Sequence, residues 1–192
     1  QLTSAARETI RRAGLVVVAP RHRALADGHP NVAALGKFEE TFAAVDAALE
    51  QGSVAVLVSG DPGVFSLLPL LKKRFPGDDL EAVPGVSSLQ SLCAAARETW
   101  IDAVVLSGHG RDLSEAKLLD AADQNKKTIF FCGPEWNPRR LCRLLADWDM
   151  NHLRLTVGER LSYGDQRLSR GSPAELAARE YDDLSLILIE NP

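Results

Sequence analysis

The stretch VAVLVSGDPG, Val54–Gly63, gives the clearest fold signal in the chain. Its apolar residues 54–58 have the length and composition of a strand buried on both faces. The two glycines, Asp61 and Pro62 of the following residues 59–63 are typical of a turn. A helical pattern from about Val64 to Phe75 comes next. A buried strand, a turn and a helix in this order predict one unit of a parallel α/β sheet.

The first half of the chain repeats this alternation. Apolar runs predict three further strands, at Leu15–Val18, Val32–Leu35 and Leu80–Val83. One helix is expected between residues 38 and 49, with Gly52 as its stop, because four apolar side chains share a face. These are Phe38, Phe42, Val45 and Leu49. A further helix follows Pro84-Gly85, capped by Ser87 or Ser88.

The second half of the chain is predicted to contain both strands and helices that begin at capping residues. The predicted strands are Ala103–Leu106, Thr128–Cys132, Leu153–Val157, Gln166–Ser169 and Leu184–Ile189. Helix starts are expected at Asp112 with Glu115, at Asn137-Pro138, and at Ser172 with Glu175. The helix after Asn137 should bury one apolar face made of Leu141, Leu144, Leu145 and Trp148.

These patterns predict an α/β protein of two domains. A boundary near Arg97–Asp102 would separate an N-terminal, mainly parallel domain (1–99) from a C-terminal, mixed α/β domain (100–192). We expect a ligand site in the cleft between the two.

Composition excludes several functional classes. The chain has 192 residues, a formal charge of −4, a sequence pI near 5.6 and 45% hydrophobic residues. It carries no basic block, so nucleic-acid binding is not expected. No apolar run reaches membrane-spanning length, and the first residues show no basic region followed by an apolar one, so no signal peptide is expected. The hydrophobic content argues against disorder.

The motifs of several enzyme classes are missing. Cys93, Cys132 and Cys142 form no CxxC pair, and we expect buried thiols in a reducing cytoplasm. The four histidines lack metal-ligand spacing. No P-loop, complete GxGxxG fingerprint or GxSxG elbow occurs.

Three turns after strands are candidate binding loops: Ser59–Gly63, Pro84–Ser88 and Ser107–Arg111. The carboxyl ends of strands in open sheets are common ligand sites, although ordinary turns have the same composition. Asp61 could bind a hydroxyl, ammonium or sulfonium group. Arg111 could bind a carboxylate.

These turns, in this order, resemble the tetrapyrrole (corrin/porphyrin) methyltransferase family, which uses S-adenosylmethionine. The resemblance rests on VLVSGDPGVFS (56–66), VPGVSS (83–88) and the helix containing Ala94–Ala96. SGHGR (107–111) and GERLSYGDQR (158–167) are similar to the branch that methylates C5 of precorrin-7 or cobalt-precorrin-7 in cobalamin biosynthesis. The resemblance runs from about Leu2 to Ile189.

The resemblance implies two α/β domains with the cofactor between them, bound as S-adenosylmethionine and released as S-adenosylhomocysteine. It implies cofactor contacts from both domains, at Ser59, Gly60, Asp61, Val64, Ser87, Ser88, Cys132, Gly158 and Leu161. The expected substrate is a precorrin whose carboxylates need cations. Candidates for those contacts are Arg21, Arg23, His109 and Arg111.

Methyl transfer from a sulfonium requires alignment more than acid or base catalysis. The sequence identifies no catalytic base, and Asp61 is expected to orient the cofactor. The resemblance also implies a homodimer and a separate C15-methylating decarboxylase partner. Family members begin with a strand and a Gly-Pro-Gly turn that would precede Leu2, and this chain lacks them. Two alternatives stay open: a methyltransferase of the same fold acting at another precorrin position or on ribosomal RNA, and a non-catalytic cofactor-binding subunit.

Overall fold

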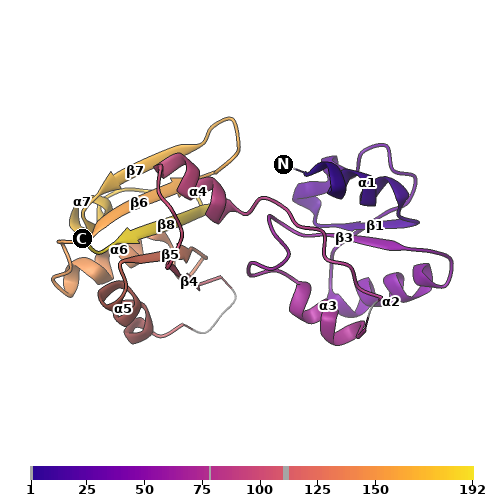
Figure 1. Cartoon of the computed structure of the whole chain (residues 1–192), viewed down its shortest axis with the longest axis horizontal. Helices are drawn as coiled ribbons and strands as arrows, with labels where there is room; N and C mark the ends of the chain where they lie inside the picture. Colours follow the sequence, from indigo (N-terminus) through magenta and orange to yellow (C-terminus); the bar gives the residue numbers. More distant parts are fainter. Residues whose placement is uncertain (1, 78, 110–112) are drawn as a thin grey trace. The chain divides into compact units, whose positions relative to one another are not determined.

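The computed structural model describes residues 2–77, 79–109 and 113–192 (Figure 1). The described chain forms two compact units, Gln1–Ser87 and Ser88–Pro192. The division therefore falls before helix α4 (Ser88–Ala96), whereas the sequence analysis placed it after that helix. The reason is packing: Leu89 and Leu92 of α4 lie in one hydrophobic cluster with Leu188 of the second unit.

The first unit is built on a three-stranded parallel sheet of order β2-β1-β3. Its strands are β1 (Leu15–Val18), β2 (Val32–Ala34) and β3 (Val54–Leu57). Its helices are α1 (Ser4–Arg12), the 3-10 helix η1 (Pro20–Ala26), α2 (Phe38–Leu49) and α3 (Leu68–Arg74). Figure 1 shows α1 on one side of this sheet and α2 and α3 on the other.

The central strand of this sheet is β1, in which Val16, Val17 and Val18 are at most 1% exposed. We expected the fully buried strand at residues 54–58. That expectation was wrong, because β3 pairs only with β1 among the described strands and only Ala55 and Leu57 are buried. The first-unit core consists of Ile10, Val16, Val18, Ala26, Ala55 and Leu57.

Three other sequence expectations for this unit need correction. Leu80–Val83 forms no strand in the described structure. Helix α3 begins at Leu68 and not near Val64, because Phe65 has a φ of 44°, which helical backbone does not allow. In α2, Phe38 and Leu49 are 47% and 45% exposed, so the ends of the predicted apolar face lie outside the core.

The second unit contains a five-stranded mixed sheet of order β4-β5-β8-β6-β7. Its strands are β4 (Val104–Ser107), β5 (Lys127–Phe131), β6 (Arg154–Glu159), β7 (Arg167–Gly171) and β8 (Ser185–Glu190). Its helices after α4 are α5 (Glu115–Gln124), α6 (Pro138–Asp147) and α7 (Pro173–Ala177). Strands β4 and β5 are parallel, whereas β8 is antiparallel to both β5 and β6.

Alternation along the strands divides the second-unit core into two layers. Ile129 and Leu188 pack with α4, in a cluster that also holds Leu89, Leu92 and Leu161. Phe130 and Ile187, their neighbours in sequence, belong to the other cluster, with leucines of α5, α6 and α7. Because successive side chains of a strand point to opposite faces, the sheet is covered by helices on both sides.

Two of the helix caps predicted for this unit, at Asn137 and at Ser172, are present in the structure. Asn137 caps α6 by accepting from the Arg140 amide, and Ser172 and Glu175 form a capping box at α7. The cap of α5 is Ser114, one residue before Glu115, and Asp112 lies outside the described residues. Trp148 is 65% exposed, because α6 ends at Asp147, so its predicted place on the buried face was wrong.

The three cysteines are free and buried, as predicted. Within the described ranges, no helix is long and apolar enough to cross a membrane. The same ranges contain no group of three or more metal-ligating side chains.

Candidate functional site

Two of the predicted binding loops lie against each other in the first unit. Residues 59–63 follow β3, and residues 84–87 precede α4. The Asp61 carboxylate joins them: Oδ1 accepts from the Gly63 amide at 2.7 Å and Oδ2 from the Gly85 amide at 3.4 Å. Asp61 therefore stabilises the turn in which it lies, residues 59–63, and connects this turn to the second loop, residues 84–87.

Glycine allows this close approach. A Cβ atom on Gly85 would lie 2.4 Å from the carbonyl oxygen of Gly60, where no side chain fits. Gly60 has a φ of +67°, and its Cβ would lie 3.1 Å from Ser87 Cα. Both positions require glycine, one for space and the other mainly for backbone conformation.

A cluster of polar side chains lies beside this pair of loops. Arg21 Nη2 donates to Ser59 Oγ at 2.8 Å, and His22 Nε2 lies 2.8 Å from the same oxygen. Arg21 Nε donates to His22 Nε2 at 3.1 Å. Arg21 and Ser59 were expected from the sequence, whereas His22 was not, because a lone histidine on a 3-10 turn has no motif around it.

The remaining first-unit candidates lie in and beside the loops. Val64 is half-buried, and its amide donates to the Asp61 carbonyl oxygen at 3.0 Å. Ser87 is 3% exposed. Ser88 is the first residue of α4, and Arg23 is exposed on η1.

In the second unit, several predicted residues lie at one edge of the sheet. Strands β4, β5 and β6 run in the same direction, so their carboxyl ends share an edge. The Cys132 amide donates to the Ser185 carbonyl oxygen at 3.2 Å, and the Arg160 amide donates to that of Leu184 at 2.9 Å. The start of β8 therefore lies between the ends of β5 and β6.

The loops after β4 and β5 also touch. A Cβ on Gly133 would lie 2.8 Å from the Gly108 carbonyl oxygen. His109 is exposed, and its amide donates to Ser107 Oγ at 3.2 Å. Arg111, the predicted carboxylate-binding residue of this loop, lies outside the described residues.

Cys132 offers this edge an apolar surface rather than a reactive group. Burial raises the pKa of its thiol well above the ordinary range, although the neighbouring Ser185 side chain opposes the shift. The thiol therefore stays protonated and is no nucleophile.

Gly158 and Leu161 belong to the core beneath the edge. A Cβ on Gly158 would lie 2.7 Å from Leu92 Cδ1 and 2.9 Å from Leu161 Cδ2. Leu161 is 8% exposed. Any ligand contact from these residues would involve mainly the backbone. Between them, Arg160 pairs with Asp165 at 2.6 Å and approaches Asp182 at 3.6 Å, contacts that the sequence did not reveal.

The fold and loops define an α/β protein whose candidate binding loops lie at the carboxyl ends of its strands, where open α/β sheets commonly bind ligands. Residues 1–177 match the family model described as Tetrapyrrole (Corrin/Porphyrin) Methylases. The chain belongs to this family and is an S-adenosylmethionine-dependent methyltransferase.

Two curated relatives are similar in sequence. The "Probable cobalt-precorrin-7 C(5)-methyltransferase" of Methanocaldococcus jannaschii is 28% identical over 144 residues, which cover 74% of this chain and 67% of the relative. The "Precorrin-6Y C(5,15)-methyltransferase [decarboxylating]" of Sinorhizobium sp is 32% identical over 140 residues, 70% of this chain and 32% of that protein.

Solved structures support the fold. The crystal structure of the methyltransferase CobJ superposes with a TM-score of 0.81 at 18% identity, covering 99% of this chain and 88% of that one. The uroporphyrin-III C-methyl transferase of Thermus thermophilus, complexed with S-adenyl homocysteine, has a TM-score of 0.70 at 22% identity and covers 99% and 91% of the two chains.

The first-unit loops fit the methionine part of the cofactor. S-adenosylmethionine carries an ammonium, a carboxylate and a sulfonium cation. Asp61 supplies a negative charge whose oxygens are already fixed by backbone amides, and each oxygen keeps further acceptor capacity. Ser59 adds an exposed hydroxyl. This donor and acceptor set is suited to an amino-acid group.

Proposed function

We propose that this chain methylates C5 of precorrin-7 or cobalt-precorrin-7, a step of cobalamin biosynthesis. Membership of the tetrapyrrole methylases supports a tetrapyrrole substrate, and the name of the archaeal relative supports the C5 position. One structural observation carries the cofactor part: Asp61 and two glycines build a fixed loop pair at the carboxyl end of β3.

The cofactor contacts that we propose come from both units. In the first unit, Asp61 would hold the ammonium group, while Ser59, Gly60, Val64 and the Ser87-Ser88 segment would line the methionine part. In the second unit, Cys132 would lie beside the adenosine, with backbone contacts from Gly158–Leu161. The bound cofactor supplies a methyl group on a sulfonium, which leaves as a neutral thioether. These residues position the reactants, which can lower a barrier by several kcal/mol.

Cations on the chain would bind the carboxylates of the precorrin. Arg21 is exposed and has no carboxylate partner within the described residues, so its charge is available to a substrate. We assign this role also to Arg111 and His109, with Arg23 as a weaker candidate. A planar guanidinium suits carboxylate binding because it donates two parallel hydrogen bonds.

A C15-methylating decarboxylase acting on the same pathway is the partner that we propose. The name of the relative from Sinorhizobium sp, which includes a decarboxylating C15 activity, supports a C15 reaction on the same substrate class. A cytoplasmic location and a homodimer remain predictions, the first in keeping with the three free thiols.

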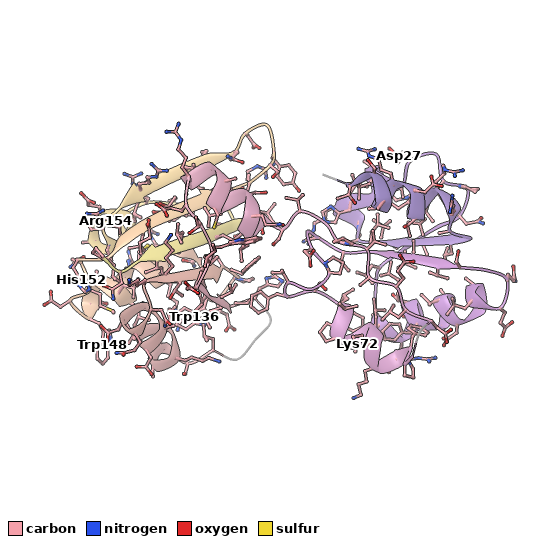
Figure 2. The ribbon with its side chains drawn as sticks, viewed as in Figure 1. Asp27, Lys72, Trp136, Trp148, His152 and Arg154 are labelled. Carbon is pink, nitrogen blue, oxygen red and sulfur yellow. The ribbon has the colours of Figure 1, made fainter. Side chains whose placement is uncertain are left out.

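Calorimetric titration with S-adenosylhomocysteine tests the cofactor site. The wild-type chain should bind with micromolar affinity, and Asp61→Ala should weaken binding about tenfold or more, because the ammonium loses its counter-charge and Gly85 its hydrogen-bond acceptor. Asp27→Ala is the matched control, since Asp27 is an exposed aspartate of the same unit (Figure 2).

Mass spectrometry of the product then tests the reaction. Incubation with precorrin-7 should add one methyl group to the ring, and NMR should place it at C5. Equal affinity of the Asp61→Ala and wild-type chains would contradict the cofactor assignment. A methyl group at another carbon would contradict the proposed position.

A further inference from the structure

We propose that His22 and Ser59 anchor the Arg21 guanidinium so that its free edge binds one carboxylate of a bound ligand. Two ligands carry such a group: the precorrin, on its side chains, and the cofactor, on its methionine part. The precorrin source rests on the proposed function. His22 and Ser59 act through Arg21 and are therefore positioning residues.

The fold brings the three side chains together at one edge of the first sheet. Strands β1 and β3 are parallel neighbours in which Val18 pairs with Leu57, so the chain leaves both strands at the same edge. The 3-10 helix η1 follows β1 and carries Arg21 and His22, whereas Ser59 follows β3. The contact between them is thus a product of strand pairing.

The guanidinium of Arg21 is anchored by one of its two edges. Nε donates to His22 Nε2 at 3.1 Å, and Nη2 donates to Ser59 Oγ at 2.8 Å. These two N–H groups lie side by side on the planar group, and their acceptors are 2.8 Å apart, which suits that edge. The second edge, formed by Nη1 and the other N–H of Nη2, remains for a ligand.

His22 can accept from Arg21 only as a neutral ring. Its Nε2 atom has one lone pair, which the Arg21 N–H occupies, so the ring proton lies on Nδ1. Burial, and then the positive charge of Arg21, lower the pKa of His22 below its ordinary value of 6.5. The ring is therefore neutral near pH 7, and the anchor is intact there.

The free edge of Arg21 is suited to a carboxylate. The side chain is exposed, and no Asp or Glu among the described residues pairs with it. Two N–H groups on one edge can donate in parallel to the two oxygens of a carboxylate. Because the anchored guanidinium has already lost part of its rotamer freedom, binding costs less conformational entropy than at an unanchored surface arginine.

Calorimetry and steady-state methylation of precorrin-7 test this contact and identify the source of the carboxylate. For a precorrin carboxylate, Arg21→Ala should raise KM for precorrin-7 about tenfold or more, with kcat within about threefold and S-adenosylhomocysteine affinity unchanged. For the cofactor carboxylate, Arg21→Ala should weaken S-adenosylhomocysteine binding about tenfold or more but leave the affinity for its decarboxylated analogue unchanged. Arg154→Ala, which alters an exposed arginine of the second unit, is the control and should behave as wild type (Figure 2).

Variants of His22 test the anchoring. His22→Leu removes the acceptor and should weaken the same contact about threefold or more, whereas His22→Gln, whose amide oxygen can accept from Arg21, should stay within about twofold of wild type. In the Arg21→Ala background, His22→Leu should have no further effect, because His22 acts through the guanidinium. A loss of equal size in both backgrounds would show a separate structural role and overturn the anchoring.

NMR of the intact chain tests the histidine ring without any substrate. The imidazole nitrogen signals that disappear in His22→Gln belong to His22, and near pH 7 they should show a protonated Nδ1 and an unprotonated Nε2. A proton on Nε2 would overturn the proposal, since Arg21 could not donate to that atom.

The outcomes separate this inference from the proposed function. If the wild-type chain methylates precorrin-7 at C5 while Arg21→Ala keeps both KM and S-adenosylhomocysteine affinity, the inference alone is overturned. If the wild-type chain methylates no precorrin while Arg21→Ala loses S-adenosylhomocysteine affinity, the proposed function falls and the site holds the cofactor carboxylate. If there is neither methylation nor any effect of Arg21→Ala, both fall.

Discussion

At the scale of single residues, Gly85 has the least room for a side chain among the described glycines of the first unit, because its backbone lies against Gly60. In Gly85→Ala, the added methyl group would lie 2.4 Å from a backbone oxygen, so the loops must separate. We expect a loss of about 1–3 kcal/mol in the free energy of unfolding, as in overpacked cores, and weaker S-adenosylhomocysteine binding. Chemical denaturation and calorimetry measure the two effects.

Gly36→Ala provides the comparison for this prediction, because a Cβ on Gly36 meets nothing within 4 Å. It should leave affinity unchanged. If Gly85→Ala bound the product as tightly as Gly36→Ala does, the close approach of the two loops would have no role in cofactor binding.

Sequence reasoning at this scale identified the residues of the loops but not their partners. Asp61 and Gly60 were expected because a short polar turn follows an apolar strand. The link from Asp61 to Gly85, 24 residues away, and that from Ser59 to His22, 37 residues away, depend on tertiary packing. No local pattern contains such pairs, so His22 remained hidden until the fold was known.

At the scale of elements, helix caps show how local chemistry fixes boundaries. Ser172 accepts from the Glu175 amide, and Glu175 accepts in return from the Ser172 amide at 2.8 Å. This reciprocal bonding orients α7, whose Leu176 is fully buried. Ser172→Ala should destabilise the chain by about 1 kcal/mol, measured by thermal or urea unfolding. Ser172→Thr keeps the acceptor and should cost less. Equal losses for the two variants would contradict a capping role.

Elements were predicted best where local signals agreed. The strand at Leu15–Val18 and the caps at Asn137 and Ser172 were confirmed because apolar runs and capping residues act over a few positions. The strand at Leu80–Val83 was wrong because an apolar run indicates burial, whereas a strand also needs a partner for its backbone hydrogen bonds. Partners are set by the whole chain.

At the scale of the whole molecule, each unit has a hydrophobic core of its own. The second-unit core is larger and covers both faces of a five-stranded sheet, whereas the first unit has three described strands. We expect amides of Ile187–Ile189 in β8 to exchange with solvent more slowly than those of Val16–Val18 in β1, since more buried apolar surface must be exposed to open them.

Native-state hydrogen exchange at increasing denaturant checks this expectation. The first unit should open at a lower denaturant concentration than the second. A common free energy of opening for β1 and β8 would instead show that the chain unfolds as one cooperative body. The sequence predicted two units, but it could not assign α4 to the second, because that choice depends on which sheet its leucines contact.

The order of strands in the second unit also has a consequence for synthesis on the ribosome. Strand β8 lies between β5 and β6, yet it is translated after both. Until residues 185–190 emerge, β5 and β6 each present an unpaired edge to other nascent chains and to chaperones. The first unit, whose three described strands end at Leu57, can assemble its sheet while the rest is still being translated. Slow translation between β6 and β8 would therefore prolong the interval in which this protein is most exposed to aggregation.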